Sequence, residues 1–246
     1  MTAPARSLGL DEYLLRTRGR AFNILVVTAA LAIYEVGLLI TGLPQRNAAD
    51  AILKRSLAAI HERAGLVFQI VVLALFLLAL GLHHRRGRSL SRYLGLFLVE
   101  CLFWAVILAP AIFFIGDPRL ARPDAARALL DLGAGVYEEI LFRYLLIRGL
   151  AFLLGIDFFH AFADESGHRL WPAFQASGRV LIVVLISALA FSLYHHVGPG
   201  GEPWIPSMLV FRFLAGLLFA GLFFLRGLGV CVYAHAFYDL LVHFAG

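Results

Sequence analysis

Ionisable side chains with acid–base potential interrupt an apolar stretch in the second half of the chain. The run GVYEEILFRYLL contains Glu138, Glu139 and Arg143. Residues four apart share a helix face, so Glu139 can pair with Arg143 while Glu138 points about 100° away around the axis. Two adjacent acids need more compensation than one arginine supplies. The motif therefore favours a functional site, with a structural ion-pair cluster as the alternative.

Two histidine-containing motifs follow these carboxylates. FSLYHH contains Phe191 and His195, and HAFYD places His235 and Asp239 four residues apart on one helix face. A carboxylate at Asp239 can accept a proton from the His235 imidazole and fix its tautomer. Taken singly, each motif also fits an ordinary hydrogen-bonded polar group.

Their expected depths bring the three motifs together. Glu138 lies early in one predicted helix and His195 lies at the end of the next, antiparallel helix, with His235 near the middle of the last. Such a cavity could perform general acid–base chemistry on water. The alternative is a zinc site made by Glu138, His195 and His235. No His-x-x-x-His pair supports zinc, so we expect no cofactor.

Three further charges fall inside predicted membrane helices, where charge is costly. Arg212 is either a second partner for Asp239 or the glutamate pair, or it reaches out to the membrane interface. Glu35 and Glu100 are isolated acids. We expect both to be protonated or interfacial.

The composition indicates the elements that must position these residues. Of the 246 residues, 61% are hydrophobic and 15% are charged, against about 45–50% and about 25% in soluble domains. The chain is therefore a multi-spanning membrane domain. Its net charge of +5 comes from arginines clustered between apolar runs, which flank membrane helices rather than bind nucleic acid. Cys101 and Cys231 lie within apolar runs and indicate no disulfide framework.

Hydropathy predicts an all-α, polytopic membrane helical bundle. A membrane helix needs about 20 apolar residues, and we expect about seven spans, within a range of six to eight. A shorter amphipathic helix at 51–63 is expected at the interface. We divide the single integral membrane domain into N-terminal helices at 1–120 and a catalytic core at 121–246. The predicted spans are 21–42, 65–82, 93–115, 128–155, 178–196, 206–225 and 227–244.

The basic residues between spans predict the orientation. With the N-terminus inside, twelve Lys and Arg residues lie on that side and seven on the other, as the positive-inside rule favours. This arrangement places Glu138 and His195 toward the outer half of the membrane. We expect a multi-pass protein of a prokaryotic plasma membrane, with the lipid bilayer as its surroundings.

At these motifs the sequence resembles the CAAX-prenyl protease and bacteriocin-processing (CPBP, or ABI) family of intramembrane endopeptidases. The family pattern is two Glu, three residues and Arg, then Phe, three residues and His, then His, three residues and Asn or Asp. The resemblance covers about residues 131–241, and the order and spacing agree. The matching residues are Glu138, Glu139, Arg143, Phe191, His195, His235 and Asp239.

The resemblance implies a role for each matched position. Glu138 would be the general base that activates water, and His195 would orient that water. Arg143 would pair with the glutamates, while His235 and Asp239 would stabilise the oxyanion. Family accounts include both metal-dependent and metal-free mechanisms, and we favour the metal-free one.

The resemblance also implies a substrate class. It is a protein or peptide held within or at the membrane and cut near a membrane-associated or C-terminal segment. Asp239 stands where Asn is common among the prenyl-protein proteases, so a prenylated substrate is not implied. The alternatives are a non-catalytic bacteriocin-immunity or scaffold protein and a transporter, although no pair of similar halves favours the transporter.

Overall fold

The structure is a computed structural model that describes residues 9–85, 90–108, 125–156, 178–197 and 201–245. Helices dominate these residues, and no strand occurs among them. The end of the span expected at 93–115 lies outside the described residues. The helical elements are α1 (Leu10–Arg18), α2 (Arg20–Thr41), α3 (Ala48–Ile60), α4 (Ala64–Arg85), α5 (Leu90–Leu108), α7 (Ala125–Glu139), η2 (Ile140–Leu146), α8 (Ile147–Leu153), α11 (Gly178–Tyr194), α12 (Pro206–Arg226) and α13 (Leu228–Ala245).

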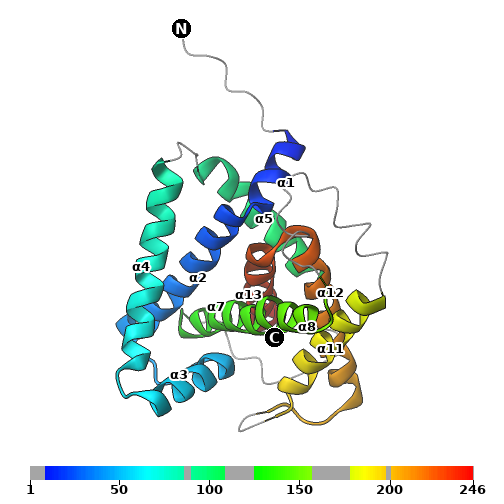
Figure 1. Ribbon diagram of the computed structural model, residues 1–246. Coiled ribbons are helices and arrows are strands. Elements are labelled where there is room, and N and C mark those ends of the chain that lie inside the picture. Colours follow the sequence, from blue (N-terminus) through cyan, green and yellow to red (C-terminus); the bar gives the residue numbers. More distant parts are fainter. Residues whose placement is uncertain (1–8, 86–89, 109–124, 157–177, 198–200, 246) are drawn as a thin grey trace.

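Helix α13 forms the centre of the bundle. It packs against α7, α5, α12 and α2, while α11 packs on α12 and α4 packs on α2 (Figure 1). In the same view α7, η2 and α8 run across the molecule, whereas α4 runs from top to bottom. The central helix therefore contacts α7 and η2, which carry Glu138, Glu139 and Arg143.

The helices have the lengths and composition of a membrane bundle. By length and apolar composition, α2, α4 and α12 could each cross a membrane, and the apolar stretches Tyr93–Leu108, Gly178–Tyr194 and Leu228–Val242 are shorter. The predicted all-helical membrane fold is confirmed. Three helices, rather than about seven, meet the full length criterion among the described residues.

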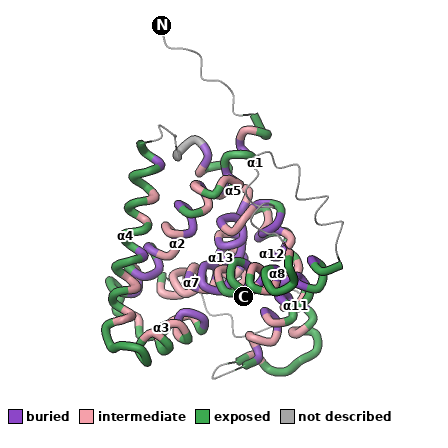
Figure 2. The backbone as a smooth tube through the Cα atoms, viewed as in Figure 1, coloured by how far each residue is buried: buried purple, intermediate pink, exposed green. Residues whose placement is uncertain are grey.

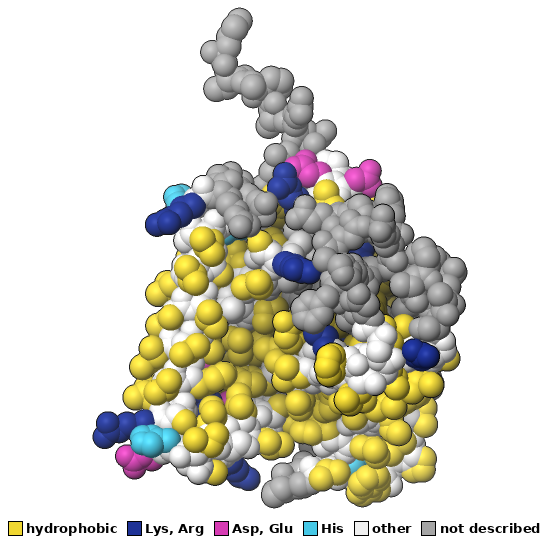
Figure 3. All heavy atoms as spheres, viewed as in Figure 1, with side chains coloured by type: hydrophobic (Ala, Val, Ile, Leu, Met, Phe, Trp, Pro, Cys, Tyr) yellow, Lys and Arg dark blue, Asp and Glu magenta, His cyan; other side chains and the backbone are white. Residues whose placement is uncertain are grey.

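The outer surface is apolar where lipid would cover it. Helix α4 is mostly exposed along its length, in contrast to α7 and α13 (Figure 2). Over α4, hydrophobic side chains fill the surface between basic side chains at its two ends (Figure 3). A surface of this kind is unfavourable in water, and it is what a helix at the edge of a membrane bundle requires.

The amphipathic helix differs from its predicted bounds. It begins at Ala48 and ends at Ile60, rather than spanning 51–63. Asn47 caps it, because its side-chain oxygen accepts a hydrogen bond from the Ala49 backbone N–H at 2.8 Å. The backbone then becomes extended at His61. Because the helix starts earlier, Asn47, at the end of the connection from α2, lies against α7.

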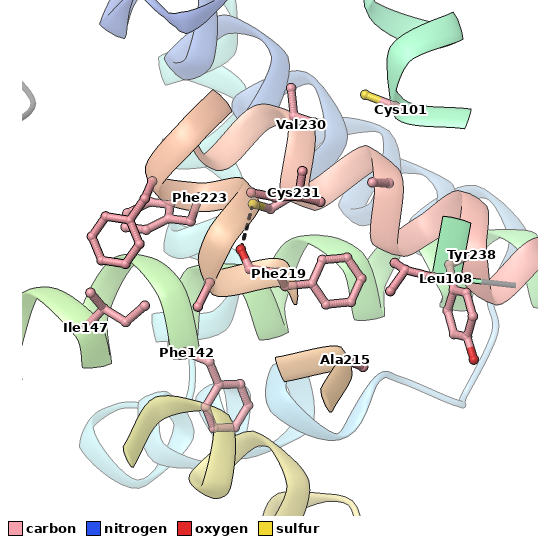
Figure 4. Packing of buried hydrophobic residues seen from close by; sticks show 14 of the residues in the cluster. Cys101, Leu108, Phe142, Ile147, Ala215, Phe219, Phe223, Val230, Cys231 and Tyr238 are labelled. Atoms are coloured by element: carbon pink, nitrogen blue, oxygen red, sulfur yellow. Dashed lines mark hydrogen bonds between the residues drawn. The ribbon is translucent and has the colours of Figure 1, made fainter. Parts of the chain in front are cut away.

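Close approaches between helices form the core. A Cβ on Gly135 would lie 2.5 Å from the Val232 carbonyl oxygen, so α7 and α13 meet almost backbone to backbone. Gly216 of α12 makes a second close approach, because a Cβ there would lie 2.9 Å from Cα of Ala188 on α11. The buried cysteine Cys231 is free, as expected, and its thiol contacts the Phe219 carbonyl oxygen at 3.4 Å (Figure 4).

The helix predicted at 128–155 contains an unexpected wide turn. Residues Ile140–Leu146 form a π-helix between α7 and α8. The Ile147 N–H donates to the Phe142 carbonyl, five residues back, and the Ser187 hydroxyl of α11 donates to the same oxygen at 2.9 Å. This second donor from a neighbouring helix stabilises a buried carbonyl of the wide turn. Such turns occur frequently at functional sites.

Candidate active site

The structure brings all six predicted catalytic residues into one buried cluster. Two come from the end of α7, one from η2, one follows α11 and two lie on α13. Helix α13 packs on α7 and also contacts η2, so residues far apart in the sequence become neighbours. The residues are Glu138, Glu139, Arg143, His195, His235 and Asp239.

The two carboxylate oxygens of Glu138 have different surroundings. Oε1 accepts a hydrogen bond from the Asn47 amide at 2.9 Å. Oε2 lies 3.6 Å from Nε2 of His195 and 4.0 Å from Nε2 of His235. It has no hydrogen-bond partner among the described residues, although Glu138 is only 4% exposed. Buried polar atoms are normally satisfied, so Oε2 can accept a hydrogen bond from a further donor.

His195 presents a defined nitrogen to Glu138. Its Nδ1 lies 2.8 Å from the Phe191 carbonyl oxygen, and a carbonyl oxygen can only accept, so Nδ1 carries the proton. In the neutral ring, Nε2 is then the unprotonated nitrogen that faces Glu138. The Phe191 ring also packs on the imidazole, with 4.7 Å between centroids. Phe191 thus fixes both the position and the tautomer of His195.

His235 is oriented by Glu139 rather than by Asp239, which corrects the expectation from the sequence. Its Nδ1 lies 2.8 Å from Oε1 of Glu139, and its Nε2 lies 3.5 Å from Asp239. A neighbouring helix therefore holds the ring through Nδ1. The remaining nitrogen faces both Asp239 and Glu138.

The predicted pairing of Glu139 with Arg143 is confirmed. Nε of Arg143 lies 3.1 Å from Oε2 of Glu139, and neither side chain is exposed. The guanidinium carbon also lies 4.2 Å from the centre of the Phe191 ring and 5.3 Å from that of Phe219. Aromatic faces stabilise a desolvated cation. Arg143 therefore compensates the charge of Glu139.

Arg212 has a different partner from those expected. It makes two hydrogen bonds to the Glu202 carboxylate, one of them 3.2 Å long, rather than binding Asp239 or the glutamate pair. The Glu202 backbone N–H in turn donates to the His195 carbonyl oxygen at 2.8 Å. Arg212 thus stabilises the segment that follows His195.

The isolated acids are paired rather than solitary. Glu35 accepts hydrogen bonds from the Tyr137 hydroxyl and the Gln69 amide, and it lies 3.1 Å from Nζ of Lys54. Glu100 forms an ion pair with Arg226. Tyr137 immediately precedes Glu138, so the contacts of Glu35 also help to fix this part of α7. The sequence did not predict these contacts of Glu35 and Glu100, because the partners are distant along the chain.

Sequence reasoning also missed Asn47, the residue that contacts Glu138 from outside the three motifs. It lies between the first predicted span and the amphipathic helix. Its one local signal is the preference of asparagine for helix N-caps. That preference says nothing of a contact 91 positions away.

The three zinc candidates converge without forming a ready-made metal site. Both imidazoles use Nδ1 for other contacts and direct Nε2 toward Glu138, as metal-binding histidines do. Within the described part of the chain, however, no group of three His, Cys, Asp or Glu side chains is arranged to hold a metal ion.

Comparisons with known proteins support the resemblance. Residues 126–241 match the family described as type II CAAX prenyl endopeptidase Rce1-like. All six residues of the cluster and both supporting residues, Phe191 and Arg212, lie within this segment. No curated protein and no solved structure matches the chain.

Proposed function

We propose that the protein is an intramembrane endopeptidase, because residues 126–241 match the family described as type II CAAX prenyl endopeptidase Rce1-like. Its substrate is a protein or peptide held within or at the membrane and cut near a membrane-associated or C-terminal segment. The observation that carries this proposal is the buried Glu138 carboxylate, with one oxygen held and the other facing two imidazoles.

In the proposed mechanism Glu138 activates a water molecule. As the water oxygen bonds to the scissile carbonyl carbon, Oε2 takes the water proton, and the carbonyl electron pair moves onto its oxygen. The unprotonated Nε2 of His195 accepts a hydrogen bond from the same water and orients it. When the tetrahedral intermediate collapses, the C–N bond breaks and Glu138 returns the proton to the leaving amine.

We assign stabilisation of the oxyanion to His235. Its Nδ1 donates to Glu139, so donation from Nε2 requires the doubly protonated ring. Asp239, 3.5 Å from Nε2, offers a carboxylate partner for that form. Positioned donors of this kind typically contribute about 10²–10³-fold to the rate. Zinc held by Glu138, His195 and His235 is the alternative; it would supply a Lewis acid for the same carbonyl.

The test is turnover by purified variants in detergent. Glu138→Gln keeps the shape of the side chain but removes the base, so we expect a fall in kcat of about 10²–10⁴-fold. His195→Ala and His235→Ala should be comparably severe. Glu62→Gln is the control, because Glu62 is 81% exposed and its variant should turn over normally.

Two outcomes would change the proposal. A Glu138→Gln protein with wild-type turnover would refute the mechanism. About one zinc per chain by elemental analysis, lost together with activity in the two histidine variants, would replace glutamate-activated water with the zinc alternative.

A further inference from the structure

Asn47 contacts the candidate base although it lies far outside the family-matched segment at 126–241. Its amide Nδ2 donates to Oε1 of Glu138 at 2.9 Å. Among the described residues, this is the hydrogen bond that the Glu138 carboxylate accepts. A residue between α2 and α3 thus reaches the centre of the site carried by α7, α11 and α13.

The orientation of the Asn47 amide follows from its second contact. Its Oδ1 accepts the Ala49 backbone N–H at 2.8 Å as the N-cap of α3. A side-chain NH₂ could not accept that bond, so the amide nitrogen must face Glu138. One side chain therefore caps a helix and donates to a carboxylate at the same time.

The backbone at Asn47 is held as well. Its N–H donates to the Tyr34 hydroxyl at 3.2 Å, and that hydroxyl donates to Asp50 at 3.1 Å. Arg46 pairs with the same Asp50 carboxylate at 2.9 Å. The Tyr34 ring lies where a Cβ on Gly133 of α7 would be, 2.2 Å from its nearest carbon. The corner between α2 and α3 is thus docked directly on the helix that carries Glu138.

We propose that Asn47 is a positioning residue for Glu138. By holding Oε1, it fixes the carboxylate rotamer in which Oε2 faces His195 and His235. This inference rests on the proposed function. It adds that the N-terminal helices complete the proteolytic site rather than only anchor it.

The test compares variants that separate capping from donation. Asn47→Ser retains an oxygen that can cap α3, but its shorter side chain withdraws the donor from Glu138. We expect kcat to fall on the order of 10²-fold, as a misplaced catalytic group does, with KM and melting temperature unchanged. Asn47→Asp has the same shape and also caps, but it places a carboxylate against Glu138, so its kcat should fall further.

Asn23 provides the matched control. Its amide donates to three backbone carbonyls near the start of α2, and its oxygen accepts from the Gly229 N–H at 2.8 Å. Asn23→Ser should lower the melting temperature without a loss of kcat. This is the opposite of the pattern expected for Asn47→Ser.

The possible results distinguish a failure of the positioning role from a failure of the proposed function. Wild-type kcat in both Asn47→Ser and Asn47→Asp, with Glu138→Gln inactive, would overturn the positioning role and leave the proposed function standing. A rise in KM alone would also overturn it, because that change indicates substrate binding. If Glu138→Gln itself turned over normally, the proposed function would fail first. If Asn47→Ser does not fold, the isosteric Asn47→Asp variant decides by the same kcat measurement.

Discussion

Adjacent glutamates in this site have opposite electrostatic surroundings. Glu139 forms an ion pair with Arg143 and contacts His235, whereas Oε2 of Glu138 faces the imidazoles of His195 and His235. Successive residues on a helix point about 100° apart around its axis, so two identical side chains meet different neighbours. The role of Glu139 is therefore testable separately from that of Glu138.

At the residue scale we predict that Glu139→Gln costs mainly stability. The amide oxygen can still accept from Nδ1 of His235, so turnover should exceed that of Glu138→Gln. Arg143, fully buried, would lose its counter-charge, and breaking a buried pair costs about 3–5 kcal/mol. Thermal unfolding in detergent, together with turnover of the same preparations, measures both effects.

Glu202→Gln is the matched comparison for this loss. It removes the partner of Arg212, whose side chain and that of Glu202 are 19% and 29% exposed, so solvent screening makes its cost smaller. Equal melting temperatures for Glu139→Gln and the wild-type protein would contradict the prediction.

Local spacing explains which residue contacts the sequence could predict. Glu139 and Arg143 are four apart on one helix, and their pairing follows from helix geometry alone. The Glu139–His235 and Glu138–Asn47 contacts join residues 96 and 91 positions apart. They depend on how three helices pack, so no local pattern contains them.

The packing of α7 on α13 is the element-scale feature that brings the carboxylates to His235. Gly135 and Ala236 meet at this crossing, one turn from Glu138 and one residue from His235. The absence of a side chain at Gly135 sets how near the two helices lie. Any added volume there must separate Glu138 and Glu139 from His235.

We predict that Gly135→Ala impairs both folding and turnover. The new methyl would lie 2.5 Å from one backbone oxygen and 2.9 Å from one backbone nitrogen of α13, and backbone atoms cannot yield as a flexible side chain would. Overpacking of this kind costs about 1–3 kcal/mol. Melting temperature and kcat should fall together.

Gly149→Ala, on the same continuous helix, is the control. A Cβ there meets nothing within 4 Å, and alanine favours a helix interior over glycine by about 1 kcal/mol. This variant should be as stable as wild type or more so, with normal turnover. A Gly135→Ala protein that behaved in the same way would show that the crossing tolerates expansion.

Helix positions were largely predictable because apolar runs between clusters of arginine specify them. The bounds of α3 and the wide turn η2 were not. The start of α3 depends on the Asn47 cap. The wide turn depends on Ser187, a donor from another helix. Both features depend on hydrogen bonds that hydropathy does not encode.

For the whole molecule, the site joins the two halves of the chain. Three helices, α2, α4 and α12, have the length and composition of membrane spans, and Asn47 extends the site beyond the proposed core at 121–246. The site lies at the end of the bundle where α3 packs on α7. The side of the membrane that this end faces follows from the orientation of α4.

We predict that this end faces outward. Helix α4 has 22 residues, or about 33 Å at 1.5 Å per residue, so Glu62 and Arg85 lie on opposite sides of the membrane. With Cys101 and Cys231 replaced by alanine, an impermeant thiol reagent added outside should label Glu62→Cys and not Arg85→Cys. Labelling of Arg85→Cys alone would reverse the orientation and favour a cytosolic substrate.

The wide turn η2 also affects how this chain is aligned with others. A hydrogen bond that reaches five residues back, from Ile147 to Phe142, contains one residue more than the four-residue step of an α-helix. Against a relative whose helix is regular throughout, equivalent positions therefore shift by one beyond Leu146. An ungapped alignment would keep Glu138 and Glu139 matched but would compare each residue of α8 with a neighbour on the wrong face. A correct alignment therefore needs a one-residue gap inside the helix, where alignment procedures place gaps least readily.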